Sequence, residues 1–249
     1  MKEIILGKLR EIEEKEKVKI ILAVESGSRA WGFASPDSDY DVRFIYVRPK
    51  EDYLKLEPVR DVIEWQLDET LDINGWDLKK TLQLLYKGNS TIFEWCASPV
   101  VYLDTPEADV LRALLPVYFS SKKGLFHYWH MADSNYRSYL KGDMVRIKKY
   151  FYVLRPILAA KWIIDRESPP PMLFSELVDA ELEADLRPVV ERLLDMKVSM
   201  PETEYAPKVQ VLNDYIEEGL KIVKEIAEEV EAEPVGWEKL DEVFLEIVG

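Results

Sequence analysis

The fold is decided by Gly27-Ser28-Arg29-Ala30-Trp31-Gly32, which is followed by Asp39-Tyr40-Asp41. Apolar runs rich in branched side chains lie on both sides, at residues 18–24 and 42–47. Such runs predict two buried strands, with the glycine-serine turn between them. The sequence thus places a tight turn and a pair of carboxylates at the ends of neighbouring strands.

Side chains alternate along an extended chain, so Asp39 and Asp41 are expected to share one face while Tyr40 points away. Two hard oxygen ligands side by side suit Mg²⁺, which fills its other positions with water and substrate phosphates. A glycine at position 27 lets backbone N–H groups approach phosphate oxygens closely. The pattern therefore predicts a site for a metal and a triphosphate.

An ordinary turn is the alternative interpretation of the same residues. Asp37-Ser38-Asp39 follows Pro36, and Pro, Asp and Ser are common in turns because their side chains or rings favour the turn backbone. Asp41 favours the metal site, since it lies within an apolar run, where a carboxylate is costly unless it is paired or bound.

The chain resembles the polymerase-beta-type nucleotidyltransferase superfamily in Gly27-Ser28 and Asp39-x-Asp41. It is more closely similar to YcgL-type proteins, the group that includes the RNA-repair-associated polymerase-beta-like (RlaP) family. Further blocks that carry this resemblance span residues 18–165: Asp72-Ile73-Asn74-Gly75-Trp76-Asp77-Leu78, Lys87-Gly88-Asn89, Glu94-Trp95, Ser98-Pro99 and Lys148-Lys149-Tyr150-Phe151-Tyr152-Val153-Leu154-Arg155-Pro156.

The resemblance implies an α+β fold with a nucleotidyltransferase-like mixed sheet and flanking helices, followed by a mainly helical C-terminal domain. We expect a catalytic domain at residues 1–105 and a helical domain at residues 106–249 that contributes nucleotide or substrate contacts. Apolar periodicity agrees with the second part, because it predicts helices over 107–117, 121–141 and 143–165, and others near 175–197 and 207–232.

The superfamily pattern also implies a third carboxylate on a neighbouring strand. Asp72, flanked by Leu71 and Ile73, is the preferred candidate, and Asp77 is the competitor. Asp77 has a structural explanation of its own, because it precedes an apolar-periodic segment where a helix N-cap belongs. With Asp39 and Asp41, this third residue is expected to hold two Mg²⁺ or Mn²⁺ ions and to accept the proton of an attacking hydroxyl.

Nucleotide contacts are expected from two parts of the chain. The turn that would hold the phosphates contains Gly27, Ser28 and Arg29. For Arg29 the alternative is that its side chain points to solvent. From the last family block the resemblance implies triphosphate contacts by Lys148, Lys149 and Arg155. Tyr150 or Tyr152 would stack on the base, although an aromatic on such a helix more often belongs to the core.

Charge is distributed unevenly along these 249 residues. The net charge of −14 argues against strong nonspecific attachment to nucleic acid. Residues 137–161, however, carry seven basic side chains against Asp143 alone. This basic segment is interpreted either as a binding strip for a triphosphate or short RNA, with tyrosines for stacking, or as a solvated helix face.

The expected activity is metal-dependent transfer of a nucleoside monophosphate, from ATP or another NTP, to a hydroxyl with release of pyrophosphate. An RNA end, as in RNA repair, is the leading acceptor. The alternatives are a protein or small-molecule hydroxyl, and a nucleotide-binding partner protein without turnover. A single cysteine, an acidic N-terminus unlike a signal peptide and the lack of a long apolar run indicate a cytoplasmic protein without membrane attachment. The sequence does not indicate an oligomeric state.

Overall fold

The computed structural model describes residues 1–68, 70–199 and 205–249, the side chains of 66–68 excepted. The chain divides into two compact units. The first, the sheet unit, comprises residues 1–30, 39–118 and 234–249, and the second, the helical unit, comprises residues 31–38 and 119–233. This division differs from the expected split after residue 105, because residues 31–38 belong to the helical unit and residues 106–118 and 234–249 belong to the sheet unit.

The sheet unit is built on five strands in the order β3-β4-β2-β1-β5. β2 and β4 run parallel, and the other neighbours are antiparallel, so the sheet is mixed as expected. The strands are β1 (Lys19–Glu25), β2 (Tyr40–Val47), β3 (Val62–Asp68), β4 (Leu71–Asp77) and β5 (Val101–Asp104).

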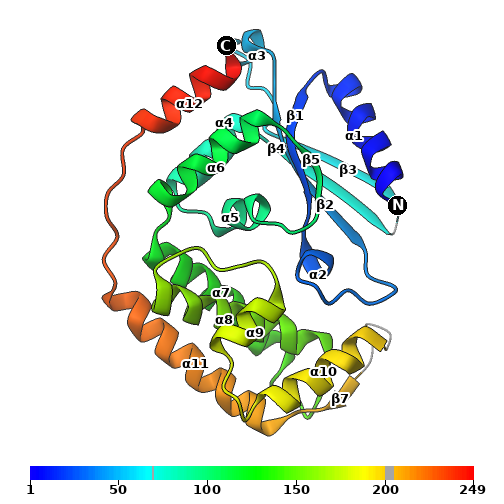
Figure 1. The fold of residues 1–249 in the computed structure, drawn as a ribbon, viewed down its shortest axis with the longest axis vertical. Coiled ribbons are helices and arrows are strands. Elements are labelled where there is room, and N and C mark those ends of the chain that lie inside the picture. Colours follow the sequence, from blue (N-terminus) through cyan, green and yellow to red (C-terminus); the bar gives the residue numbers. More distant parts are fainter. Residues whose placement is uncertain (69, 200–204) are drawn as a thin grey trace. The chain divides into compact units, whose positions relative to one another are not determined.

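Helices cover both faces of this sheet (Figure 1). α1 (Lys2–Glu16) lies on one face, where Ile5, Leu9 and Ile12 are buried against Phe44 and other strand residues. α4 (Leu78–Tyr86), α5 (Ser90–Cys96) and α6 (Pro106–Tyr118) lie on the other. The two short helices are α2 (Gly27–Ala30) and α3 (Lys50–Tyr53).

Two helices begin at residues whose side chains cap them, and the first confirms the N-cap expected at Asp77. The side chain of Asp77 accepts a hydrogen bond from the Lys79 backbone N–H at the start of α4, and Asn89 does the same for Thr91 at the start of α5. Both residues thus satisfy N–H groups that a helix terminus leaves without an intrahelical partner.

The sheet unit also includes a helix that follows the helical unit in sequence. α12 (Glu238–Val248) belongs to it, and Trp237 just before α12 stacks on Tyr86 with ring centroids 3.7 Å apart. The Tyr118 hydroxyl donates to the carbonyl of Gly236, and Phe244 packs edge-on against Tyr53. Aromatic contacts therefore attach residues 234–249 to the sheet unit.

The helical unit is centred on α8 (Lys148–Arg166), which packs against α7 (Ser121–Tyr139), α9 (Phe174–Glu181) and α11 (Gln210–Glu229). α10 (Arg187–Ser199) follows α9. Eleven residues of α8 are buried, among them Pro156, which lies inside the helix. The segment expected as one helix near 175–197 is two helices, separated after Glu181.

The expectation of a helix over 143–165 is wrong at its start. Met144–Arg146 form a short strand, β6, which pairs antiparallel with β7 (Tyr205–Pro207). The apolar pattern continued through this stretch because Val145 is buried in a strand as it would have been in a helix. A three-residue strand offers too little periodicity to be told from a helical turn.

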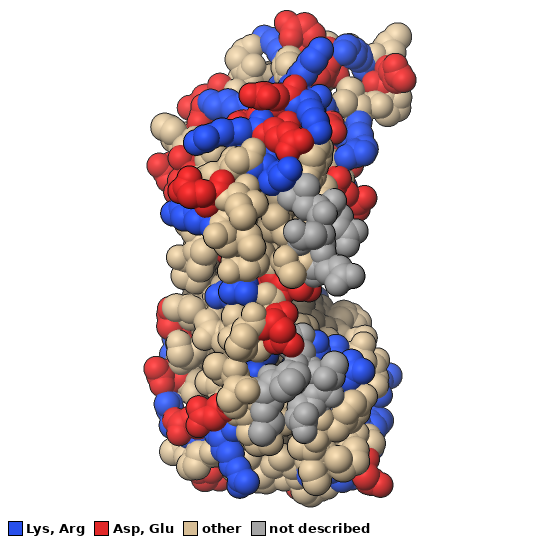
Figure 2. Space-filling model, turned by 90° about the vertical axis from the view of Figure 1, so that its right-hand side faces the viewer, with Lys and Arg blue, Asp and Glu red and all other residues tan. Residues whose placement is uncertain are grey.

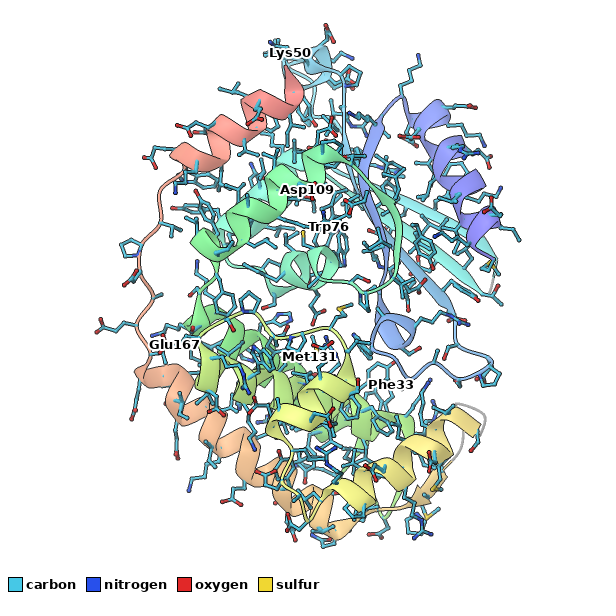
Figure 3. The ribbon with its side chains drawn as sticks, viewed as in Figure 1. Phe33, Lys50, Trp76, Asp109, Met131 and Glu167 are labelled. Atoms are coloured by element: carbon cyan, nitrogen blue, oxygen red, sulfur yellow. The ribbon has the colours of Figure 1, made fainter. Side chains whose placement is uncertain are left out.

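Residues 31–38 follow the glycine-serine turn and belong to the core of the helical unit. Phe33 is 2% exposed, and its ring lies 5.2 Å from Phe151 and 5.4 Å from Phe174 (Figure 3). The Trp31 carbonyl accepts the backbone N–H of Phe174. The loop between the glycine-serine turn and the carboxylates is therefore packed by the helical unit.

No helix in the described ranges is both long enough and apolar enough to cross a membrane.

Candidate active site

Two carboxylates come together where β2 and β4 run side by side. Asp41 and Asp72 are direct neighbours in the parallel register. Nη2 of Arg43 lies 3.0 Å from Oδ1 of Asp41 and 2.8 Å from Oδ2 of Asp72. Nη1 of the same guanidinium donates to the backbone carbonyls of Val42 and Asp72. One cationic side chain thus bridges the two predicted ligand residues.

The Gly27 turn lies directly against the carboxylate of Asp41. Gly27 has φ +60°, and a Cβ added there would lie 2.3 Å from Oδ2 of Asp41. The backbone N–H of Ser26 donates to the carbonyl of Asp41, which fixes the turn to β2. Only glycine combines this backbone conformation with so close an approach. The turn and the carboxylate therefore form one local structure, as the motif spacing suggested.

Arg29 joins the turn to the segment before β2. Its Nε donates to the backbone carbonyl of Asp39 at 3.0 Å, and its guanidinium lies 3.7 Å from the centroid of the Tyr40 ring. Asp39 itself is exposed and precedes β2. Arg29 thereby holds residues 27–30 to residues 39–40 within the sheet unit. Its role as a nucleotide contact stays a prediction.

Glu25 is a part of this site that the sequence reasoning missed. Its carboxylate is fully buried, accepts the Asp41 backbone N–H at 2.7 Å and accepts the Tyr102 hydroxyl. Burial raises the pKa of Glu25, opposed by these hydrogen bonds. The available signal was its place at the end of the apolar run of β1, where a buried acid needs partners. Glu25 thus fixes the position of the Asp41 backbone through this hydrogen bond.

Electrostatics identify the site as a place that favours a cation. Burial raises the pKa of Asp41, the charge of Arg43 lowers it, and the charges of Asp72 and Asp39 raise it again. Asp72 and Asp39 are therefore close enough to disfavour the ionised form of Asp41. Additional positive charge beside them would relieve this repulsion.

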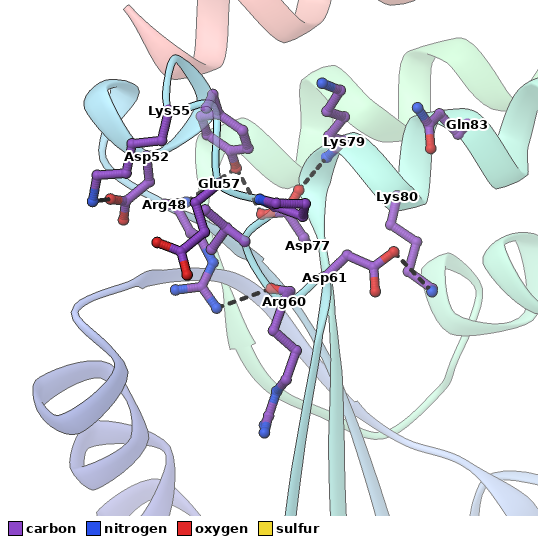
Figure 4. A pocket seen from close by; sticks show the side chains of 13 residues that line it. Arg48, Asp52, Lys55, Glu57, Arg60, Asp61, Asp77, Lys79, Lys80 and Gln83 are labelled. Atoms are coloured by element: carbon purple, nitrogen blue, oxygen red, sulfur yellow. Dashed lines mark hydrogen bonds and ion pairs between the residues drawn. The ribbon is translucent and has the colours of Figure 1, made fainter.

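Asp77, the competing third carboxylate, occupies the opposite end of β4. Five residues of strand separate it from Asp72, or about 16 Å at the usual rise per residue. It is 4% exposed, caps α4 through Lys79 and accepts the Tyr53 hydroxyl at 2.8 Å. It lines a separate pocket of about 270 Å³ with Arg48 and Arg60 (Figure 4). Within the described residues, Asp72 is the candidate that adjoins Asp41.

The candidates on α8 all belong to the helical unit, and two of them are core residues. Tyr150 is 1% exposed, and its hydroxyl donates to Oδ1 of Asn213 and accepts the Val209 backbone N–H. Arg155 is 1% exposed and lies 4.8 Å from the Trp31 ring. These two contacts explain both residues structurally, and nucleotide contacts by them stay predictions.

Lys148 and Lys149 are half-buried at the start of α8. Nζ of Lys149 lies 3.8 Å from the Tyr139 ring and 4.9 Å from the Tyr152 ring. Tyr152 is half-buried and packs edge-on against Trp31. Of the predicted nucleotide contacts on α8, the two lysines and Tyr152 thus retain access to solvent.

A family model described as the RNA repair pathway DNA polymerase beta family, RlaP, matches residues 1–246. The chain belongs to this family. A curated relative, the uncharacterized protein YcgL of Bacillus subtilis, is 46% identical over 235 residues, which cover 94% of this chain and 90% of the relative. RlaP membership supports a general nucleotidyltransferase role of the polymerase-beta type.

Among solved structures, a nucleotidyltransferase-like protein from Exiguobacterium sibiricum matches with 12% identity and a TM-score of 0.32. The match covers 90% of this chain and 75% of that one.

The RlaP site has the donor chemistry for a divalent ion. In the described residues no group of three or more His, Cys, Asp or Glu side chains is gathered tightly enough to hold a metal. Mg²⁺ nevertheless binds commonly through one or two carboxylates, with phosphates and water completing its shell. The pair Asp41 and Asp72, with Asp39 nearby, meets that requirement. In the structure the Arg43 guanidinium supplies the positive charge between them.

Replacing Arg43 by Gln is expected to destabilise the metal-free RlaP protein and to enlarge its stabilisation by Mn²⁺. Without the guanidinium, Asp41 and Asp72 face each other unneutralised. The loss should be about 1 kcal/mol, since one partner is half exposed. Melting temperature in EDTA should fall by about 2–4 °C.

The measurement is thermal unfolding of both proteins in EDTA and in excess Mn²⁺. Arg10→Gln, an exposed arginine on α1, is the matched control. Equal melting temperatures and equal metal-induced shifts in the Arg43 variant and wild type would show that Arg43 does not neutralise this pair.

Proposed function

We propose that this protein is a metal-dependent nucleotidyltransferase that transfers a nucleoside monophosphate from an NTP, such as ATP, to the hydroxyl at an RNA end, with release of pyrophosphate. One observation carries the proposal: Asp41 and Asp72 lie side by side on parallel strands, with the Gly27 turn against the Asp41 carboxylate. Family membership supports the general chemistry, and its RNA-repair description supports the acceptor.

The proposed roles follow from position and exposure. Asp39, Asp41 and Asp72 would hold two Mg²⁺ or Mn²⁺ ions, which when bound would neutralise charge that develops on the phosphate oxygens. Asp72 has a half-exposed side chain, so it can reach an acceptor hydroxyl and accept its proton as that oxygen attacks the α-phosphorus. The bond to pyrophosphate then breaks, and pyrophosphate carries away the bonding electrons.

Binding of the triphosphate is assigned to the turn and to Lys148. Gly27 and Ser28 would place backbone N–H groups against phosphate oxygens, because no side chain at position 27 obstructs the approach. Of the two lysines, Lys148 on α8 is proposed as a phosphate contact from the family resemblance, whereas Lys149 lines a pocket of the helical unit. Glu25 and Arg29 would act by positioning, since they hold the backbone of Asp41 and Asp39 respectively.

The test is incubation of the full chain with each α-³²P-labelled NTP, Mg²⁺ or Mn²⁺ and a mixed RNA pool. Labelled RNA together with released pyrophosphate is the expected result. Pyrophosphate release with labelled protein, or without labelled RNA, would assign a different acceptor. Nucleotide binding with neither product would contradict the catalytic proposal.

A further inference from the structure

A pocket of about 530 Å³ in the helical unit is lined by basic side chains. It lies where the end of α7, the strands β6 and β7 and the start of α8 meet. Four cations line it, and no acidic side chain does so among the residues that the structure describes. We call this site the basic pocket, and its cations are Arg137, Lys141, Arg146 and Lys149.

Three of these cations lack a carboxylate partner in the described part of the chain. Arg137 is paired with Asp133 at 2.9 Å on its own helix. Lys141, Arg146 and Lys149 instead lie over tyrosine rings, at 6.0, 5.4 and 3.8 Å from the centroids. Asp143, which lies between Lys141 and Arg146 in sequence, has a side chain that is 99% exposed and lies 4.0 Å from Nζ of Lys208. Among the residues that the structure describes, most of the positive charge of the basic pocket therefore has no carboxylate partner.

Figure 2 shows Lys and Arg side chains gathered on the lower right of the face it presents, whereas basic and acidic side chains alternate over its upper part. In a chain with a net charge of −14, a uniformly basic pocket opposes the general repulsion of anions. It selects locally for a polyanion, because screening confines its attraction to about a Debye length.

Two tyrosines of the basic pocket present their rings to solvent. Tyr139 is 46% exposed and Tyr205 is 51% exposed. The Tyr205 hydroxyl accepts a hydrogen bond from Nε of Arg146 at 3.0 Å, which fixes the ring beside a cation. Aromatic faces interleaved with cations are the arrangement that binds unpaired bases and their phosphates together.

We propose that the basic pocket binds single-stranded RNA, with Lys141, Arg146 and Lys149 on phosphates and Tyr139 and Tyr205 stacked on bases. A duplex fits less well, because its bases are paired and its recognition relies on backbone shape. A single nucleotide would use one ring and one or two cations, whereas this pocket offers two rings and three cations that pair with no carboxylate of the described residues. In catalysis the basic pocket would hold the acceptor strand, and this role rests on the proposed function. RNA binding by the pocket does not depend on that function.

The experiment measures fluorescence anisotropy of a labelled single strand of RNA, about 12 nucleotides long, with the full chain in EDTA and without NTP. For three phosphate contacts the logarithm of affinity should fall with the logarithm of salt concentration with a slope of about −2. The double variant Lys141→Gln, Arg146→Gln should bind roughly tenfold more weakly, and its slope should be shallower by about 1.4. Neither residue belongs to the proposed nucleotide site.

Two further variants separate charge from stacking. Tyr139→Ala should lower affinity about tenfold with the salt slope unchanged, because stacking releases no counterions. Lys221→Gln removes an exposed cation of α11 and should leave both quantities unchanged. Thermal unfolding of each variant shows whether its fold is retained.

The proposal is overturned if the double variant binds RNA as tightly as wild type does, or if the wild-type protein binds no RNA. Full displacement of the RNA by a single equivalent of ATP would also overturn it and assign the pocket to the nucleotide. The α-³²P transfer assay is independent of these outcomes. If the protein binds RNA but transfers no nucleotide, the basic pocket is supported and the proposed function is rejected. If it transfers nucleotide but the double variant binds RNA as tightly as wild type, the proposed function is supported and the basic pocket is rejected.

Discussion

Replacing Asp41 by Asn, or Asp72 by Asn, is expected to lower nucleotide transfer by about a thousandfold or more while the fold is retained. Each substitution removes one charged ligand oxygen from a site that works by electrostatic stabilisation, and three decades in rate correspond to about 4 kcal/mol. Burial and neighbouring acids raise the pKa of Asp41, so folding makes its ionised form less favourable than it is in the unfolded chain. The neutral Asn should therefore change the melting temperature little. Transfer rates and thermal unfolding measure the two effects.

Asp77→Asn is the matched control on the same strand. Its amide oxygen can still cap α4, because Asn caps as well as Asp, and the loss of the oxygen that accepts the Tyr53 hydroxyl should cost about 1 kcal/mol in stability. Its transfer rate should stay near that of wild type. A thousandfold loss in Asp77→Asn with normal activity in Asp72→Asn would transfer the third ligand role to Asp77. Full activity in Asp41→Asn would reject the site altogether.

Gly27→Ala is expected to abolish transfer and to destabilise the sheet unit. The new Cβ would lie 2.3 Å from Oδ2 of Asp41, and φ +60° is unfavourable for alanine. The carboxylate or the turn must then shift, which separates the phosphate site from the ligand. The backbone strain alone costs about 1–2 kcal/mol. Transfer rate, Mn²⁺ affinity and urea unfolding should all change together.

Two other glycine substitutions distinguish the effect of the location of Gly27 beside Asp41 from the effect of a steric clash in the sheet. Gly75→Ala places a Cβ 2.1 Å from the Phe44 ring, so it should destabilise the same sheet without touching a carboxylate. Gly7→Ala meets nothing within 4 Å on α1 and should stabilise the protein by about 0.5–1 kcal/mol. If Gly27→Ala lost no more transfer activity than Gly75→Ala at equal stability, the turn would have no role in the reaction.

Much of the sheet unit could be predicted from the sequence. The strands around the motif, the helix of residues 2–16 and the caps Asp77 and Asn89 depend on local periodicity and capping, which the sequence displays directly. α12 and the packing of residues 31–38 could not be predicted, because both depend on which distant surface receives an aromatic residue. Trp237 and Phe33 carry no local signal that names Tyr86 or Phe151 as their partners.

The candidate site divides in the same way. Asp39-x-Asp41 and Gly27 could be found from spacing, and the pairing of Asp41 with Asp72 required the parallel register of β2 and β4. The roles of Arg43 and Glu25 in the site could not be predicted, because a charged residue in a strand gives no indication of its partner across the sheet. Tyr150 and Arg155 belong to a sequence block that resembles the family. Their burial could not be predicted from that block, because it depends on the packing of the folded helical unit.

The division of the chain between the two units has a consequence for synthesis on the ribosome. The chain crosses from one unit to the other after residues 30, 38, 118 and 233. The site-bearing sheet unit therefore cannot complete its packing until residues 234–249 have emerged, long after Asp72 has been made. Contacts of such high sequence separation close slowly, because a large loop must be ordered first. Residues 119–233 of the helical unit emerge while the nascent sheet unit still lacks α12, so the strands that carry Asp41 and Asp72 are made long before the last helix that packs on their unit.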